Sequence, residues 1–172
     1  MNVNIRNVTI KDLSSVTRVE ASCFPEAEAA TYDSLKKRIK TFPECFFIAE
    51  VEGEIIGFIN GCRINGITIS DELFIDTSLH VTAGAYQTIF GLDVIAEYRK
   101  QGIAGQLLSQ MINAAKKDGC KGVILTCKEK LIMYYAKFGF VNKGISESEH
   151  GGAIWYDMIL EFYIGEDNDK LG

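Results

Sequence analysis

The chain has 172 residues, of which 47% are apolar and 24% are charged, and its net charge is -5. This composition predicts one globular domain and argues against a disordered or membrane-embedded chain. The acidic balance argues against a nucleic-acid-binding surface, which needs clustered Lys and Arg. Because the N-terminal residues contain no apolar signal segment, we expect a cytoplasmic protein that binds neither nucleic acid nor a membrane. We expect one domain over residues 1–164, an acidic flexible tail over 165–172, and a monomer or homodimer.

The five cysteines are odd in number and contain no C-x-x-C pair, and most of them lie in apolar segments. We therefore expect reduced thiols that pack as small apolar side chains. His80 and His150 lie far apart in the sequence, and neither has a second ligand at a metal-site spacing. No metal site is expected.

In chain order, residues 4–8 have the composition of a short edge strand. Thr9 and Asp12 then have the spacing of a capping box, which predicts the start of a helix. A second helix is expected over residues 32–40, and it must end before Pro43. Two β-rich runs, 45–51 and 54–63, flank the two-residue turn Glu52-Gly53, so they predict a β-hairpin.

The second half of the chain alternates strands and helices. After an irregular segment over 64–86, with a short helix near 70–74, the pattern predicts strands at 87–95, 122–127, 139–144 and 153–162, and helices at 102–117 and 130–138. Combined with the hairpin in the first half, this order predicts an α/β fold (α+β mixed) in which helices cover both faces of a mixed sheet.

The sequence "EYRKQGIAGQLL" joins the strand at 87–95 to the helix that follows it. The first N–H groups of a helix lack intrahelical partners and carry partial positive charge, so they attract anions. Gly102 and Gly105 have no side chain to obstruct a phosphate, while Arg99 and Lys100 add full positive charge. The pattern predicts a site for the pyrophosphate of a nucleotide or of CoA. It is weak on its own, because a solvated turn also uses glycines.

Two motifs in family order supply the context. The stretch "LDVIAEYRKQGIAGQLL" resembles the acetyl-CoA loop of the GNAT N-acetyltransferases, with Arg99, Gly102 and Ala104 at the motif positions. The stretch "YAKFGF", from Tyr135 to Phe140, resembles the family's second signature. The segments "ASCFPEAEAAT" and "LTCKEKLIMYYAKFGF" are similar to the arylalkylamine N-acetyltransferase branch, particularly its bacterial relatives.

The resemblance implies a mostly antiparallel central sheet with a splayed central strand, and acetyl-CoA as cosubstrate. It implies that pantetheine pairs like an extra strand with Leu92, Asp93 and Val94. The cofactor-binding loop is then formed by Arg99, Lys100, Gln101, Gly102, Ile103, Ala104 and Gly105. Glycine inside a strand also marks a bulge or a close backbone approach, which makes Gly91 consistent with this arrangement.

Direct acetyl transfer needs an acid that protonates the departing thiolate, and Tyr135 is our candidate. Tyr134 is also available, but neighbouring residues of a helix point about 100° apart, and the spacing to Gly139 selects Tyr135. The base stays open. A water chain that ends on Glu26 or Glu28 is one candidate, and solvated loop acids are the ordinary explanation for both. We expect Cys127 to pack in the core.

The resemblance places the acceptor pocket under the turn after the first helix, where Phe24, Pro25 and Tyr32 offer apolar and aromatic walls. Thr88 and Phe90 align with a histidine pair that animal members of the branch carry, so a proton path through those histidines is not expected. Glu26 and Glu28 are expected to attract the ammonium group. We expect a small apolar or aromatic primary amine as acceptor. The alternatives are a protein or peptide acetyltransferase and a non-catalytic acetyl-CoA sensor.

Overall fold

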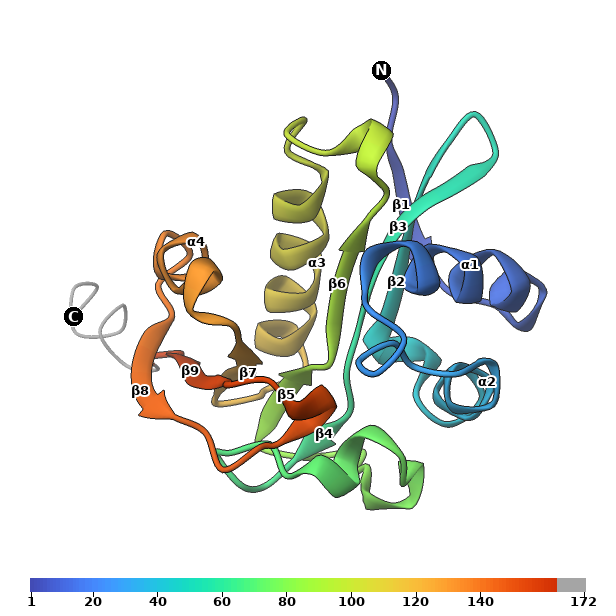
Figure 1. The fold of residues 1–172 in the computed structure, drawn as a ribbon. Helices are drawn as coiled ribbons and strands as arrows, with labels where there is room; N and C mark the ends of the chain where they lie inside the picture. The colour runs from blue at the N-terminus through green and yellow to red at the C-terminus, as the bar shows by residue number, and fades with distance from the viewer. Residues whose placement is uncertain (164–172) are drawn as a thin grey trace, which may run out of the picture.

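The computed structural model describes residues 1–163 and contains two β-sheets that meet at a break in one strand (Figure 1). The first sheet has the strand order β1-β2-β3-β6, formed by Asn4–Asn7, Phe46–Val51, Glu54–Asn60 and Gly91–Val94. The second has the order β4-β5-β7-β9-β8, formed by Arg63–Ile64, Tyr86–Ile89, Gly122–Cys127, Tyr156–Glu161 and Val141–Ile145. All neighbours are antiparallel except β5 and β7. The expected mixed, mostly antiparallel fold is confirmed.

The strand expected over residues 87–95 is two strands, because the chain changes sheets at Phe90. β5 pairs with β7, whereas β6 pairs with β3. The neighbouring segment breaks at the same level, since β3 ends at Asn60 and β4 begins at Arg63. Phe90 N–H donates to the carbonyl of Asn60 at 2.7 Å, so two residues, Phe90 and Gly91, face one residue of β3. This bulge ends one ladder and starts the other.

Helices cover both faces of the first sheet. α1 (Leu13–Cys23) contacts β3 and β6 from one side, and α2 (Tyr32–Thr41) packs against α1. α3 (Ile103–Lys117) contacts β2, β3, β6 and β7 from the other side, as Figure 1 shows. The short α4 (Ile132–Ala136) follows β7. None of the helices in residues 1–163 is long and apolar enough to cross a membrane.

Amphipathic patterns explain this layering. The apolar positions of α3 recur at helical spacing and are buried at Leu107, Leu108, Met111 and Ala115. Those of α1 are buried at Leu13, Val16 and Val19, in a separate cluster with Phe46 and Phe58. Truncating one of these fully buried leucines to alanine costs about 2–5 kcal/mol. All five cysteines are free, and four of them are buried. The tail expected over 165–172 lies outside the described residues.

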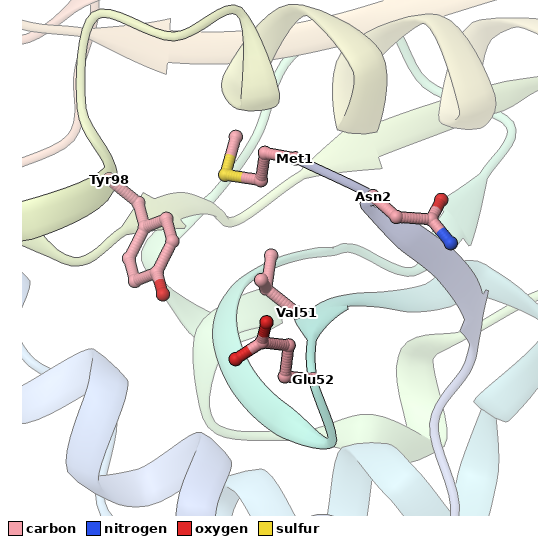
Figure 2. Close-up of a pocket in the computed structure, with 5 residues that line it drawn as sticks. All are labelled: Met1, Asn2, Val51, Glu52 and Tyr98. Atoms are coloured by element: carbon pink, nitrogen blue, oxygen red, sulfur yellow. The ribbon is translucent and has the colours of Figure 1, made fainter.

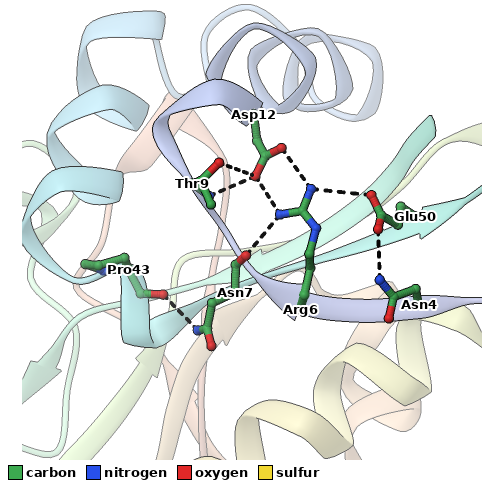
Figure 3. Close-up of polar contacts among 7 residues, drawn as sticks. All are labelled: Asn4, Arg6, Asn7, Thr9, Asp12, Pro43 and Glu50. Atoms are coloured by element: carbon green, nitrogen blue, oxygen red, sulfur yellow. Dashed lines mark hydrogen bonds and ion pairs between the residues drawn. The ribbon is translucent and has the colours of Figure 1, made fainter. Parts of the chain in front are cut away.

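The predicted capping box at Thr9 and Asp12 is present and extends into a charge network (Figure 3). Asp12 Oδ2 accepts from the Thr9 N–H at 2.8 Å, and both Asp12 oxygens accept from the Arg6 guanidinium, at 2.8 and 3.0 Å. The guanidinium also reaches Glu50 Oε2 at 3.4 Å. Hydrogen bonds from Arg6, followed by the Thr9 N–H, lower the pKa of Asp12 against the opposing effect of burial. The network therefore joins β1, β2 and the start of α1.

We predict that Asp12→Asn lowers the free energy of unfolding by about 1–2 kcal/mol, because the amide replaces a charge-assisted cap by a neutral one. A lowered folded-state pKa stabilises the protein fully above the unfolded value of 3.8, and this stabilisation is lost as the pH falls through the folded value. The difference between wild type and variant in urea unfolding should therefore shrink in acid. Asp33→Asn, at an exposed position in α2, is the control, and an equal loss in both variants would contradict the prediction.

Candidate active site

The loop before α3 presents free backbone N–H groups to open space. Lys100 and Gly102 have positive φ angles of 61° and 81°, and Gly102 is the N-cap of α3. The helical ladder begins with the bond from Gln106 N to Gly102 O at 3.1 Å, so Ile103, Ala104 and Gly105 have N–H groups without an intrahelical partner. A methyl group placed on Gly102 would meet nothing within 4 Å. An anion can thus approach this helix end.

Of the other predicted loop residues, some are exposed beside the start of α3 and some make contacts that hold the loop in the fold. Lys100 and Gln101 are exposed beside the helix end. Arg99 instead uses its Nε to donate to the carbonyl of Val94 at 2.9 Å, which ties the loop to the end of β6. Gly105 lies against Phe138, whose Cζ would be 3.5 Å from a methyl group at that position. Gly105 therefore has a packing role that the sequence analysis did not anticipate.

β6 is the last strand of its sheet in the described chain, and its outer edge has no strand partner. Its register pairs Asp93 with Phe58, and Ile95 N–H donates to Ile56 O at 2.9 Å, so the backbone groups of Asp93 point toward β3. In an antiparallel ladder the alternate residues face the other way. The N–H groups of Leu92 and Val94 therefore face the gap between the two sheets, where an extended amide ligand can pair with them.

The two tyrosines of α4 differ in burial. Tyr135 is buried, and its ring packs edge to face against Phe140, with ring centroids 5.8 Å apart. Burial, with a smaller contribution from nearby Cys127, raises the pKa of the Tyr135 phenol, so it stays protonated at neutral pH. Tyr134 is half-buried and stacks edge to face on Tyr135 at 5.3 Å. Both rings also meet the core under α3.

Contacts of Glu28 hold the turn between α1 and α2 in place, which corrects the expectation that this carboxylate is free to attract an ammonium group. Glu28 is buried, and its Oε1 lies 2.7 Å from Lys128 Nζ, just after β7. His150 Nε2 lies 2.8 Å from the Glu28 carbonyl oxygen. Glu28 is therefore not a free carboxylate at a pocket mouth, because Lys128 neutralises it. Glu26 and Tyr32 are exposed on the same turn, and Phe24 and Pro25 begin it.

A row of aromatic rings includes Phe90, which the sequence analysis placed in the acceptor pocket. His150 stacks on Phe74 with ring centroids 4.8 Å apart, Phe74 lies 4.9 Å from Phe90, and Phe90 lies 6.4 Å from Phe42. Trp155 continues the row beyond His150 at 5.9 Å. Phe90 is thus one member of this row. Thr88, expected beside it, is fully buried and donates its hydroxyl to the carbonyl of Cys62 at 2.9 Å, so it does not line an open surface.

The sequence analysis missed a polar cluster next to the break in the strand. Glu20, Arg38, Asn60 and Asp93 are all at most 6% exposed, and they come from α1, α2, β3 and β6. Burial lowers the pKa of Arg38 to about 10, so the guanidinium stays charged at neutral pH, and it lies 4.8 Å from the centre of the Phe90 ring. Two signals were present in the sequence: Glu20 interrupts the apolar stripe of α1, and Asp93 interrupts an apolar strand.

Two open cavities lie away from these residues. One of about 410 Å³ is lined by Met1, Asn2, Val51, Glu52 and Tyr98, beside the turn of the hairpin (Figure 2). Another of about 430 Å³ lies over β9, with Tyr86 and Asp157 among its lining residues. Within residues 1–163, no group of three or more His, Cys, Asp or Glu side chains is arranged to hold a metal ion.

Comparisons with known proteins agree with this geometry. The chain is 29% identical over 131 residues to the probable hydrolase YhcX of Bacillus subtilis (strain 168), an alignment that covers 70% of this chain and 25% of that protein. It is 26% identical over 117 residues to an N-alpha-acetyltransferase of Sulfolobus acidocaldarius, covering 67% of this chain and 64% of the relative. The chain therefore spans less than two thirds of the length of either relative.

Among solved structures, a GNAT-like decarboxylase, GphF, in complex with isobutyryl-CoA matches with a TM-score of 0.80 and 22% identity, over 92% of this chain and 98% of that one. At this identity the match shows a shared fold alone. A family model matches the sequence from the start of α1 to the end of the second motif. Because the acetyltransferase (GNAT) family model matches residues 13–140, most of the chain, this protein belongs to that family.

Proposed function

We propose that the protein transfers the acetyl group of acetyl-CoA directly to a primary amine. The observation that carries the proposal is the presence of two sets of unpaired N–H groups on consecutive elements. One set belongs to Leu92 and Val94 on the edge of β6, and the other lies at the start of α3. The first set suits the amides of pantetheine and the thioester oxygen, and the second suits the pyrophosphate. Membership of the GNAT family supports the same assignment.

The chemistry needs no covalent enzyme intermediate. The neutral amine attacks the thioester carbon, the carbon–sulfur bond breaks, and the thiolate receives a proton. Tyr135 is our proposed donor, because its buried phenol carries a proton at neutral pH and can give it to the thiolate as the thiolate leaves. Cys127 is buried and its pKa is raised by burial to about 11, which makes it a poor nucleophile.

The acceptor is proposed to be a small primary amine with an apolar or aromatic body. The aromatic row from Phe42 to Trp155 supports this class, because ring contacts and apolar burial stabilise such a side chain. The fastening of the turn by Glu28 and Lys128 leaves less room for an extended chain. The runner-up is a peptide N-terminus, which the name of the Sulfolobus acidocaldarius relative favours.

The Gly102→Glu variant should bind acetyl-CoA on the order of 100-fold more weakly, because it places a carboxylate where the pyrophosphate is proposed to lie. Gly119→Glu is a matched control. Gly119 has a φ angle of 82° and equally open surroundings, but it follows the other end of α3. Both variants carry the same backbone strain and charge. Calorimetry on the two folded variants tests the site, and equal affinities would contradict the assignment of the loop.

Tyr135→Phe should lower kcat on the order of 100-fold and leave the Kd for acetyl-CoA nearly unchanged, since only the proton donor is removed. Tyr134→Phe is the control for ring packing and should have a much smaller effect. Thiol release and calorimetry measure the two quantities. Equal turnover of the wild type and Tyr135→Phe from neutral to alkaline pH would remove Tyr135 from the chemistry. A wild type that binds acetyl-CoA and acetylates no amine would indicate a sensor.

The acceptor class predicts that kcat/KM for phenethylamine or tryptamine exceeds the values for spermidine and for a lysine peptide. Phe90→Ala should reduce this preference on the order of 10-fold, because it removes one ring from the row. The ratio between substrates is measured on one variant, so any loss of folded protein cancels. A preference of the wild type for spermidine or for peptides would overturn the small-amine proposal.

A further inference from the structure

The polar cluster of Glu20, Arg38, Asn60 and Asp93 converges on one backbone position, Gly91. A methyl group placed on Gly91 would lie 3.1 Å from Asp93 Oδ1, 3.6 Å from Asn60 Nδ2 and 3.6 Å from Glu20 Oε1. Any side chain at this position would therefore pack against these three polar atoms. Because residue 91 is glycine, the three atoms instead lie next to the backbone at the start of β6.

Several atoms of this cluster are buried without a hydrogen-bond partner. Asp93 is 1% exposed, and neither of its oxygens receives a hydrogen bond. Asn60 Nδ2 and Arg38 Nε are also unpartnered, although Arg38 Nη1 donates to Asn60 Oδ1 at 3.2 Å. Leaving a buried carboxylate unpartnered costs several kcal/mol in proteins. The cap carboxylate of Asp12, which receives hydrogen bonds from Arg6 and Thr9, shows how this chain satisfies an acid with a structural role.

Glu20 and Asp93 differ in their hydrogen bonding. Glu20 Oε2 accepts from the Ala30 N–H at 2.7 Å, whereas neither oxygen of Asp93 has a donor within residues 1–163. Burial first, then the neighbouring Glu20 and the Cys23 thiol, raise the pKa of Asp93 well above its usual range, and Arg38 opposes them. The pKa of the Tyr135 phenol is raised mainly by burial, and the charge of Asp93 is one of the smaller causes that raise it further. The Asp93 carboxyl therefore keeps its proton to a higher pH than an exposed aspartate does, and buried carboxyls of this kind are frequent at active sites.

The position of the pair fits the proposed reaction. Leu92 lies between Gly91 and Asp93, and its N–H is the group proposed to face the thioester oxygen. Asp93 lies on the face of β6 against which α1 packs, and the turn of residues 24–31 that follows α1 is the proposed cover of the acceptor. Glu20 holds this turn through Ala30, so the pair is connected to the element that must admit the amine.

We propose that Asp93, with Glu20 as its charge partner, is the general base that deprotonates the acceptor amine. This inference rests on the proposed acetyltransferase function. The ionised Asp93 carboxylate takes one proton from the acceptor ammonium, directly or through one water molecule. The neutral amine attacks the thioester carbon, the carbon–sulfur bond breaks, and Tyr135 gives its proton to the thiolate. The negative pair also attracts the ammonium group, a role that the neutralised Glu28 does not serve.

The test is the pH dependence of kcat/KM for an amine that the wild type acetylates. Asp93→Asn should lower kcat/KM on the order of 100-fold at neutral pH, with a recovery at higher pH, where the acceptor ammonium loses its proton to solvent without the base. The Kd for acetyl-CoA should stay unchanged. Asp157→Asn is the matched control, because Asp157 is a partly buried acid on β9 whose pKa burial also raises. It should leave kcat/KM and its pH profile unchanged.

The pH profile of kcat/KM in Glu20→Gln provides a second test, because a purely structural role of Glu20 would not shift this profile. The amide oxygen can still accept from Ala30, but the negative charge beside Asp93 is gone, so the pKa of Asp93 falls. Activity requires the ionised base, so kcat/KM falls on the acid side of its pH profile. In Glu20→Gln this fall, the acid limb of the profile, should move to lower pH by on the order of one unit. An unmoved limb, or an Asp93→Asn variant as active as wild type, overturns the inference. A wild type that acetylates no amine overturns the proposed function first, and the inference with it.

Discussion

The arrangement of this protein depends on one break in hydrogen bonding between β5 and β6. At Phe90 the chain leaves the ladder of β7 and joins that of β3, so the N–H groups on the outer edge of β6 have no strand partner. An unpaired strand edge is costly when it is buried and invites pairing with another extended backbone. In this fold the edge is held open by the two sheets, which diverge from the break. A ligand that resembles a strand can use the gap.

The second constraint is the distribution of buried charge around the same break. Asp12 receives hydrogen bonds from Arg6 and Thr9, and Glu28 forms an ion pair with Lys128. Among the described residues, Asp93 has neither a hydrogen-bond donor nor a close ion-pair partner, and it lies beside the break and close to Glu20. Strain or unsatisfied polarity that persists in a folded protein tends to lie where function uses it. The contrast between these acids is the physical basis for assigning them different roles.

The family relationship and the geometry answer different parts of the functional question. Membership of the GNAT family describes the fold and the class of chemistry. Fold similarity does not determine the acceptor, which depends on particular side chains. The acceptor proposed above rests on the aromatic row and on the turn held by the ion pair between Glu28 and Lys128, which are features of this chain's own residues.

The amino-acid sequence by itself determined the local features whose physics is short-range. The capping box at Thr9, the hairpin turn at Glu52 and Gly53, the amphipathic face of α3 and the loop motif from Arg99 to Gly105 were all predictable, because each rests on neighbouring residues. The tertiary structure decided what residues distant in sequence do to one another. Lys128 neutralises Glu28 across 100 positions, and Phe90 packs against Phe42 and Phe74 from two other segments. Glu20 and Asp93 approach Gly91 together because α1 packs on β6. Electrostatic and packing interactions act through space, and the pairing of β6 with β3 rather than with a neighbour of β5 sets which acids share that space.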